Sequence, residues 1–287
     1  MRFILPLFSV NAGVALASCA HGTYLQRRGT GNEEPELPDF DYGPVRGPTY
    51  WHGLSPENFL CGVGREQSPI NVNNSIPVEQ AGIIDIKVPV QEAELLNLGT
   101  TVEVILGGNT LIDGCEYELR QFHFHTPSEH WIEGKHYPME IHMVHEAKGQ
   151  SNVLMLVAML MFPSDDPSSL AVIALFVQLS STQTFHTLES IILHVDAISE
   201  PGSTVEIQNL NVTDIVDVVN EASFYRYSGS LTTPPCTEGV QFFIAQDPIP
   251  LRTEKYNDLK EVLGFNARFI QSTWPAKNVL TRASESL

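Results

Sequence analysis

Apolar and polar residues alternate in several short stretches of this chain, which is the pattern of half-buried β-strands. Gly, Pro and Asn, which favour turns, lie between the stretches. We expect strands at 83–90, 101–106, 117–125, 140–145, 170–179, 205–209 and 240–245. Two other segments, 186–195 and 253–264, have apolar residues at helical spacing, and Gly264 closes the second. The pattern predicts a mainly β protein with a few helices.

The stretch RQFHFHTPSEH, residues 120–130, places two histidines between phenylalanines. Residues i and i+2 of a strand point to the same face of a sheet. Gln121, His123 and His125 therefore share one face, which is polar. Phe122 and Phe124 share the other, which is apolar.

A second strand-like stretch, MEIHMVH at 139–145, carries a third histidine. Glu140, His142 and Val144 share one of its faces. If the two strands lie side by side, they bring three imidazoles together. His130 and His145 are interpreted as buried structural partners near this cluster.

Three imidazoles suit zinc, because three protein nitrogens with one open position form the catalytic type of zinc site. Three neutral ligands leave the full 2+ charge on the metal, so that a bound water can lose a proton near neutral pH. A ligating imidazole needs an acceptor for its other nitrogen, and Gln121 and Glu140 lie two residues before His123 and His142. A His-x-His pair alone is weak evidence, whereas the whole set predicts a Zn²⁺ site.

The chain has 287 residues, of which 43% are hydrophobic, enough for a substantial core. It has 16 basic and 34 acidic residues, a formal charge of −18. Such a charge argues against nucleic acid or an anionic membrane as a partner. The oligomeric state does not follow from these features.

The first 20 residues combine one basic residue, an apolar run and small residues suited to cleavage after Ala17 or Ala20. This predicts a secretory signal peptide, too short to span a membrane, and a secreted, extracellular or cell-wall protein. A bacterial lipoprotein signal ending at Cys19, with a periplasmic or lipid-anchored protein, is the alternative. Residues 21–40 are rich in Gly, Pro and acids, include the dibasic Arg27-Arg28, and predict an irregular arm.

Four cysteines fit an oxidising compartment if at least two of them pair. Cys61 and Cys236 lie in loop-like contexts and are the pair we expect, with Cys115 left as a thiol. Two Asn-x-Ser/Thr sequons begin at Asn73 and Asn211. They are compatible with secretion, although chance would supply about as many.

One segment does not fit the alternating pattern. The run at 151–169 has hardly a polar residue between 153 and 162, yet it is too short to span a bilayer. A buried strand, a substituted loop and an error in the coding sequence all remain open as interpretations.

Six motifs occur in this order: QSPIN at 67–71, QFHFH at 121–125, SEH at 128–130, EIHMVH at 140–145, SLTTPPCTEGV at 230–240 and NAR at 266–268. Together they closely resemble the α-class carbonic anhydrases of the secreted type. The resemblance extends from about Asp41 to about Arg282, which makes 41–282 the expected domain and 283–287 a tail. It implies a large, twisted, mostly antiparallel central sheet with peripheral helices.

The resemblance implies roles for individual residues. His123, His125 and His142 match the zinc ligands, and Gln121 and Glu140 their orienting partners. Thr232 and Glu129 match a catalytic pair in which the carboxylate accepts from the threonine, so that the threonine must accept from the reactive water. The substrate-pocket positions are matched by Val144, Val172, Leu231, Thr233, Phe242 and Tyr42, with Leu156 as the alternative to Val172. Cys61 and Cys236 match the disulfide of secreted members.

The implied activity is the reversible hydration of carbon dioxide to bicarbonate and a proton, with a secondary esterase activity. A carbonic-anhydrase-like binding module without catalysis is the alternative, although neither a ligand nor Thr232 is missing. The clearest departure is Thr100, where members with fast turnover usually carry a proton-shuttling histidine. We therefore expect turnover to depend on external buffer or on another residue such as His52. Leu98 and Glu103 replace polar amides and make one side of the pocket more apolar and more acidic.

Overall fold

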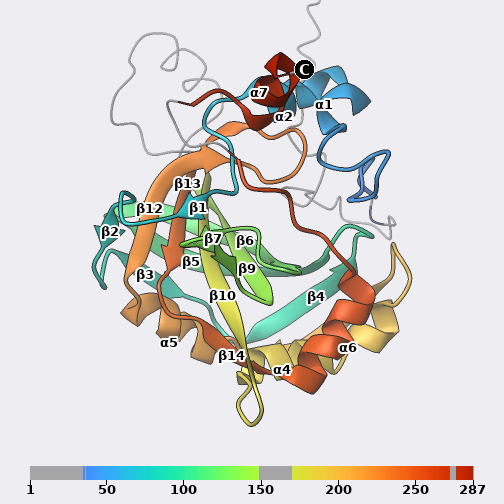
Figure 1. The fold of residues 1–287 in the computed structure, drawn as a ribbon. Helices are drawn as coiled ribbons and strands as arrows, with labels where there is room; N and C mark the ends of the chain where they lie inside the picture. The colour runs from blue at the N-terminus through green and yellow to red at the C-terminus, as the bar shows by residue number, and fades with distance from the viewer. Residues whose placement is uncertain (1–34, 36, 149–169, 272–275, 287) are drawn as a thin grey trace, which may run out of the picture.

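The computed structural model describes residues 35, 37–148, 170–271 and 276–286, and the statements below concern these residues. Eleven of their strands form one large sheet, which Figure 1 shows as the body of the molecule. These strands are β2 (Val78–Glu79), β3 (Ile84–Lys87), β4 (Gln91–Asn97), β5 (Val102–Ile112), β6 (Cys115–His125), β9 (Met139–Ala147), β10 (Leu170–Ser180), β11 (Thr204–Leu210), β12 (Phe224–Ser230), β13 (Glu238–Ala245) and β14 (Ile249–Arg252).

The main path of this sheet runs β11-β4-β5-β6-β9-β10-β13-β12-β2, with β3 paired to β5 and β14 paired to β10. Neighbours are antiparallel except that β10 runs parallel to β13 and to β14. A mainly β fold with a mostly antiparallel sheet is therefore confirmed. A separate small sheet has the order β1-β7-β8, with β1 (Asn71–Val72), β7 (Trp131–Ile132) and β8 (Lys135–His136).

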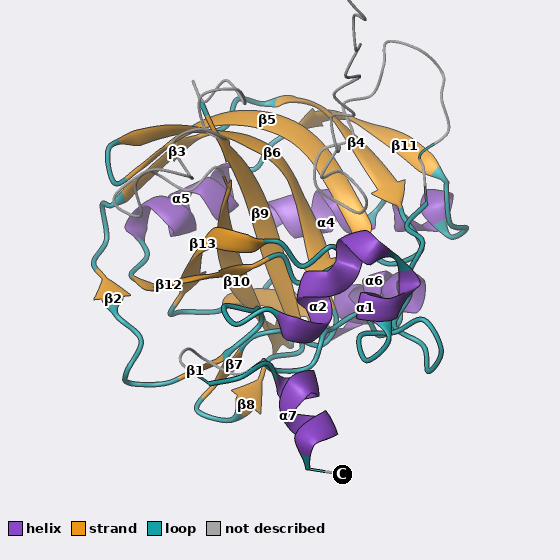
Figure 2. Ribbon diagram, turned by 90° about the horizontal axis from the view of Figure 1, so that it is seen from above, coloured by secondary structure: helices purple, strands orange, loops and turns teal. Residues whose placement is uncertain are grey.

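Helices cover one face of the large sheet. The helices α4 (His186–Ile192), α5 (Thr213–Glu221) and α6 (Thr253–Leu263) lie along that face in Figures 1 and 2. The 3₁₀-helix η2 (Val195–Ile198) contributes Val195 and Ile198 to the same core. Their apolar residues pack with Phe122, Phe124, Ile141 and Met143 of the sheet in the main core cluster. The face that carries the phenylalanines of QFHFH is thus the helix-covered core face.

A second group of short helices gathers near the C-terminus of the chain, at one end of the molecule (Figure 1). It consists of α1 (Trp51–Leu54), the 3₁₀-helix η1 (Pro56–Phe59), α2 (Leu60–Val63) and α7 (Val279–Glu285). The helix α7 contacts α2 and continues past the boundary expected at residue 282. The C-terminal residues are thereby tied to the N-terminal helices.

Most of the expected elements are present with different ends. The strand expected at 101–106 continues to Ile112, the one at 83–90 ends at Lys87, and the helix at 186–195 ends at Ile192 before η2. The helix α6 ends as predicted at Gly264, which has a positive φ of 63° that glycine tolerates and whose N–H donates to the carbonyl of Lys260. The sequence pattern did not reveal β4, β12, α5 or α7.

The strand β6 contains an irregularity that affects which way its side chains point. Its register with β9 shifts between Leu119 and Gln121, so one extra residue, Arg120, is accommodated on β6. Tyr117 and Leu119 face the helix-covered core before the shift, and Phe122 faces it afterwards. The core-facing positions therefore change from odd to even numbers at Arg120.

Several predictions concern residues outside those described. They are the signal peptide at 1–20, the arm as far as residue 34, the apolar run at 151–169, Cys19 and the alternative pocket residue Leu156. Among the described residues, no helix has the length and apolar character needed to cross a membrane.

Candidate metal centre

The pairing of β6 with β9 brings the three predicted histidines together. His123 lies directly opposite His142 in the ladder, and His125 lies opposite Glu140. The three imidazole rings are 4.6–5.4 Å apart between centroids. All three side chains are almost fully buried. The geometry predicted from strand alternation is confirmed.

Each imidazole is held by an acceptor at one nitrogen. The Nδ1 of His123 donates to Oε1 of Gln121 over 2.9 Å, and Nε2 of His142 donates to Oε1 of Glu140 over 2.7 Å. These are the orienting pairs that the sequence predicted. The Nδ1 of His125 donates to the backbone carbonyl of Asn266 over 2.8 Å. Sequence reasoning assigned no such role to Asn266, although it lies in the NAR motif.

The remaining nitrogens converge. One ligand atom from each of His123, His125 and His142 can be chosen so that all lie within 4.8 Å of one another. Since the other nitrogens are engaged, the converging atoms are Nε2 of the first two rings and Nδ1 of His142. Three imidazole nitrogens without a thiolate or carboxylate form a catalytic type of zinc donor set. The residues present therefore fit a zinc ion.

The protonation states of the ligands are set by burial and by Glu140. Burial, and then the charges of the other two rings, hold the pKa of His123 well below its usual range, and burial lowers the pKa of His125. Burial also opposes the charge on His142, but the neighbouring Glu140 carboxylate raises its pKa. The pKa of Glu140 lies well below its usual range, because His130 and His142 outweigh the effect of burial. Two neutral imidazoles and one imidazole bound to an ionised carboxylate result.

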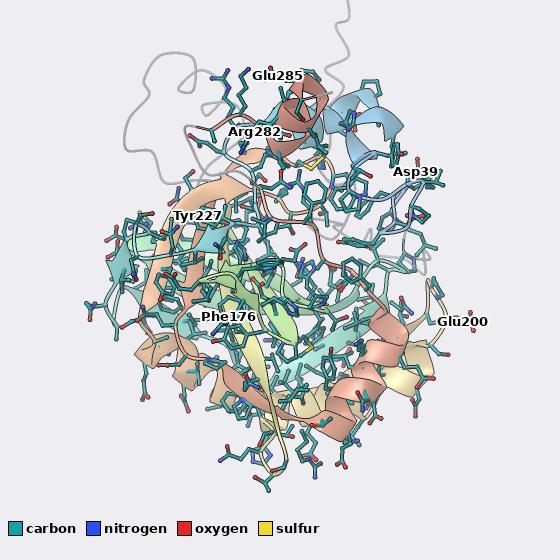
Figure 3. The ribbon with its side chains drawn as sticks, viewed as in Figure 1. Asp39, Phe176, Glu200, Tyr227, Arg282 and Glu285 are labelled. Carbon is teal, nitrogen blue, oxygen red and sulfur yellow. A yellow bond between two sulfur atoms is a disulfide. The ribbon has the colours of Figure 1, made fainter. Side chains whose placement is uncertain are left out.

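Glu140 also belongs to a longer chain of buried hydrogen bonds. Its carboxylate accepts from the backbone N–H of His130 over 2.8 Å and from His130 Nδ1 over 2.6 Å. The Nε2 of His130 lies 2.6 Å from the hydroxyl of Tyr227, which lies 2.7 Å from the hydroxyl of Ser68. Tyr227, on β12, is labelled in Figure 3. The expectation that His130 is a buried partner is confirmed.

A second group of potential ligands overlaps the first. His130, Glu140 and His142 also bring ligand atoms within 4.8 Å of one another. Those atoms are engaged in the hydrogen bonds just described. The ligand atom of His125 is not engaged in this way: its Nε2 is among the buried polar atoms without a hydrogen-bond partner in the described part of the chain, as are Oε2 of Glu129 and Oγ1 of Thr232. The first group is therefore the metal centre.

Comparison with known proteins identifies the family. The model of the eukaryotic-type carbonic anhydrases matches residues 46–275. The chain belongs to the carbonic anhydrase family. It is 32% identical to a carbonic anhydrase of Pectobacterium atrosepticum over 75% of this chain and 80% of that protein, and 30% identical to alpha carbonic anhydrase 7 of Arabidopsis thaliana over 85% and 81%. The solved structure of a fungal alpha carbonic anhydrase from Aspergillus oryzae matches with a TM-score of 0.77 at 32% identity, covering 86% of this chain and 99% of that one.

The zinc site of this carbonic anhydrase is the triad His123, His125 and His142. Beside it lies Glu129, whose Oε1 accepts from the backbone N–H of Arg268 over 2.9 Å. Its Oε2 is 3.4 Å from Nε2 of His125. Thr232 is buried too, but no direct hydrogen bond joins it to Glu129 in this structure. Their catalytic pairing stays a prediction.

Apolar side chains form a compact cluster that includes residues on the metal side of the sheet. Val172 on β10 lies opposite Val144 on β9 and beside Phe242 on β13. These three pack with Leu231 and Val240. Phe242 also lies 5.9 Å from the ring of the ligand His142. Four of the predicted pocket residues are thus brought together next to the zinc site, Val172 among them.

The two other predicted pocket residues lie in different surroundings. Thr233 is buried, and its hydroxyl has no hydrogen-bond partner among the described residues. Tyr42 is partly buried and packs with Phe40 and Trp51 around the disulfide. Whether either residue contacts substrate stays a prediction.

The predicted disulfide is present between Cys61 and Cys236 and is drawn in yellow in Figure 3. It anchors the turn that carries both threonines, because the N–H of Cys236 donates to the carbonyl of Thr233 over 2.8 Å. Gln67 donates to the carbonyl of Cys236 from the other side over 3.0 Å. Cys115 is a free, partly buried cysteine, as expected.

The three residues that depart from the family pattern, Leu98, Thr100 and Glu103, are all buried. The hydroxyl of Thr100 has no hydrogen-bond partner among the described residues. Glu103 lies opposite the ligand His123 on the neighbouring strand. Burial, and then the charge of Glu94, raise the pKa of Glu103 to about 8.

Proposed function

We propose that this protein catalyses the reversible hydration of carbon dioxide to bicarbonate and a proton, with zinc held by His123, His125 and His142. The observation that carries the proposal is the set of three buried imidazoles, each fixed at one nitrogen and converging with the others at its second nitrogen. Zinc in such a site, of which carbonic anhydrase is itself the general example, acts as a Lewis acid and lowers the pKa of a water ligand to about 7.

In this proposal Glu129 and Thr232 orient the reacting oxygen. An ionised carboxylate can only accept a hydrogen bond, so a threonine that donates to Glu129 must in turn accept from the oxygen that attacks carbon dioxide. Both side chains are buried with orphaned oxygens, and the carboxylate of Glu129 lies beside two of the ligands, which supports the pairing. The backbone N–H of Arg268 fixes the position of the Glu129 carboxylate.

Carbon dioxide is proposed to lie against Val144, Val172, Leu231 and Phe242. These side chains come from three adjacent strands and the turn that precedes Thr232, and they form one apolar cluster beside His142. A small nonpolar molecule there displaces no strongly held water. We also propose that Thr233 and Tyr42 belong to the substrate pocket. A secondary esterase activity with the same nucleophile is a further part of the proposal.

The proton released by the reaction leaves, in this proposal, to external buffer. Threonine cannot carry a proton near pH 7, and Thr100 occupies the position of the shuttle. His52, the other candidate, lies on α1 with an exposed side chain next to Gly62.

We propose that the protein works outside the cytoplasm. A disulfide between residues far apart in the sequence is consistent with an oxidising compartment. The predicted signal peptide at 1–20 favours export in the same way.

Stopped-flow measurement of carbon dioxide hydration, with zinc determined on the same sample, tests the proposal. We expect about one zinc per chain and activity that rises with buffer concentration. Full zinc occupancy without hydration would overturn the catalytic proposal and leave a zinc-binding module. An alanine variant of His125 should lose both zinc and activity, whereas one of the exposed His136 should retain both.

A further inference from the structure

Two asparagines away from the metal centre begin Asn-x-Ser/Thr triplets, Asn73-Asn74-Ser75 and Asn211-Val212-Thr213. No other triplet of this type occurs in the chain, and neither has proline in the middle. Such a triplet is the acceptor sequence for N-linked glycosylation. The sequence alone does not separate a used acceptor from a chance occurrence.

The two triplets adopt the same local structure. The Oδ1 of Asn73 accepts from the backbone N–H of Ser75 over 2.9 Å and from its hydroxyl over 2.6 Å. The Oδ1 of Asn211 accepts from the N–H of Thr213 over 3.0 Å and from its hydroxyl over 2.6 Å. In both cases the amide oxygen is engaged by the third residue of the triplet. The amide nitrogen is left without a hydrogen bond among the described residues.

Both asparagine side chains are exposed. Asn73 lies in the loop between β1 and β2, and Asn211 lies between β11 and α5. An exposed amide nitrogen at a turn can carry a large substituent without displacing packed side chains. By contrast Asn97 and Asn266 are buried, and their amide nitrogens donate to backbone carbonyls.

Asn211 is also placed where a glycan would not interfere with catalysis. The next residue, Val212, packs into the core cluster on the helix-covered side of the sheet. The zinc ligands project from the opposite face, since Phe122 and Phe124, which alternate with them on β6, point into that core. A substituent at Asn211 therefore lies on the far side of the sheet from the metal.

We propose that Asn73 and Asn211 are N-glycosylation sites. The amide Nδ2 attacks the anomeric carbon of an oligosaccharide linked to a lipid pyrophosphate. A carbon–nitrogen bond forms, the bond from carbon to the pyrophosphate oxygen breaks, Nδ2 loses a proton, and the lipid pyrophosphate leaves. The Cys61–Cys236 disulfide is consistent with an oxidising compartment, and this proposal rests on the export proposed above.

The test uses the full chain, with its own N-terminal segment, made in a eukaryotic secretory host. Intact mass is measured before and after enzymatic removal of N-glycans. We expect the wild type to carry two glycans and the Thr213→Ala and Ser75→Ala variants to carry one each. Both substitutions leave the asparagine in place and remove only the hydroxyl-bearing side chain of the third residue of the triplet.

Matched variants separate loss of the acceptor from misfolding. Thr213→Ser and Ser75→Thr keep the triplets and should keep both glycans. Asn74→Gln and Asn257→Gln change exposed asparagines that are not acceptors and should also keep both. A wild-type mass that does not fall on glycan removal would overturn the proposal, and an unchanged glycan number in either alanine variant would overturn that site. Because mass is the readout, the outcome is independent of carbon dioxide hydration.

Discussion

His130 and His142 donate to the same atom, Oε1 of Glu140, over 2.6 and 2.7 Å. One of the two rings is a zinc ligand, and the other is not. A single carboxylate oxygen therefore couples the ligand to a residue that approaches from outside the ligand set. Through this oxygen, residues outside the ligand set act on the ligand His142.

The direction of the hydrogen bonds beyond His130 follows from its neighbours. The Ser68 hydroxyl accepts from the backbone N–H of Ser230 over 3.0 Å, which leaves its own proton for Tyr227. Tyr227 then donates to Nε2 of His130, and Nδ1 of His130 donates to Glu140. A neutral His130 satisfies every bond in this chain.

Replacing Tyr227 with phenylalanine should therefore weaken zinc retention. The substitution leaves His130 Nε2 without its donor and lets the Glu140 acceptor relax. Partners outside the ligand set typically change metal affinity by 10–100-fold, and for this more distant residue we expect about tenfold faster zinc loss to a chelator. Tyr225→Phe removes a hydroxyl from the same strand that does not belong to these hydrogen bonds, and it should leave the rate of zinc loss unchanged. Equal rates of zinc loss in the two variants would contradict a role for this hydrogen-bond chain.

The orienting role of Glu129 predicts a loss of rate without loss of metal. In Glu129→Gln the amide can donate, so Thr232 is no longer forced to accept from the reacting oxygen. We expect a drop in kcat/KM for carbon dioxide hydration of about 100-fold, with zinc content unchanged. The exposed Glu133→Gln is the control. A variant with full zinc and wild-type kcat/KM would exclude this role.

The absence of a shuttle at Thr100 predicts that turnover depends on buffer. Thr100→His should raise turnover at low buffer concentration by roughly tenfold and weaken the dependence on buffer. Thr100→Val changes the side chain without adding a titratable group, so its buffer dependence should match the wild type. If the histidine variant behaves like the valine variant, proton release is limited elsewhere.

His145 predicts the acid sensitivity of the fold. It is fully buried on the core face of β9, and burial lowers its pKa to about 4. Because the folded pKa is below the unfolded value of about 6.5, the folded protein disfavours protonation, and stability is lost as pH falls from about 6.5 to 4. We expect about 3 kcal/mol of this loss to disappear in His145→Gln.

Urea unfolding of zinc-free wild type and His145→Gln at pH 7 and pH 4 measures this difference. The comparison uses the change between the two pH values, so that a lower overall stability of the variant does not affect it. His136→Gln, at an exposed position, should retain the wild-type change. The same pH dependence in all three proteins would assign the acid sensitivity to other groups.

Strand alternation was sufficient to predict the ligand set. The spacing of His123 and His125 fixes their shared face, and the pattern around His142 does the same on the neighbouring strand. The missed helix α5 contains five β-branched residues, which have low helix propensity: Thr213, Ile215, Val216, Val218 and Val219. Its formation depends on packing against the sheet, where Ile215 and Val219 are buried.

The chain from Ser68 to Glu140 could not be predicted in the same way. Its members come from four separate segments, and their contacts depend on how β12, the SEH segment and the QSPIN segment meet in space. Nothing in the sequence around Tyr227 distinguishes a tyrosine that donates to a buried histidine from any other tyrosine on a strand. The burial of His130 and the role of Glu140 as the acceptor for His142 were accessible from the sequence, whereas the links through Tyr227 and Ser68 were not.

The extra residue at Arg120 places a length constraint on β6. Before Arg120 the odd-numbered side chains of β6 face the helix-covered core, and after it the even-numbered ones do. Both halves of the strand therefore bury their apolar side chains on the same side of the sheet. Deleting Arg120 would give β6 one continuous alternation of side chains, so that only one half of the strand could keep its present orientation. If the first half kept it, the imidazoles would turn into the helix-covered core and the phenylalanines would face the metal position. The spacing within this strand is thus as necessary to the zinc site as the identity of its ligands.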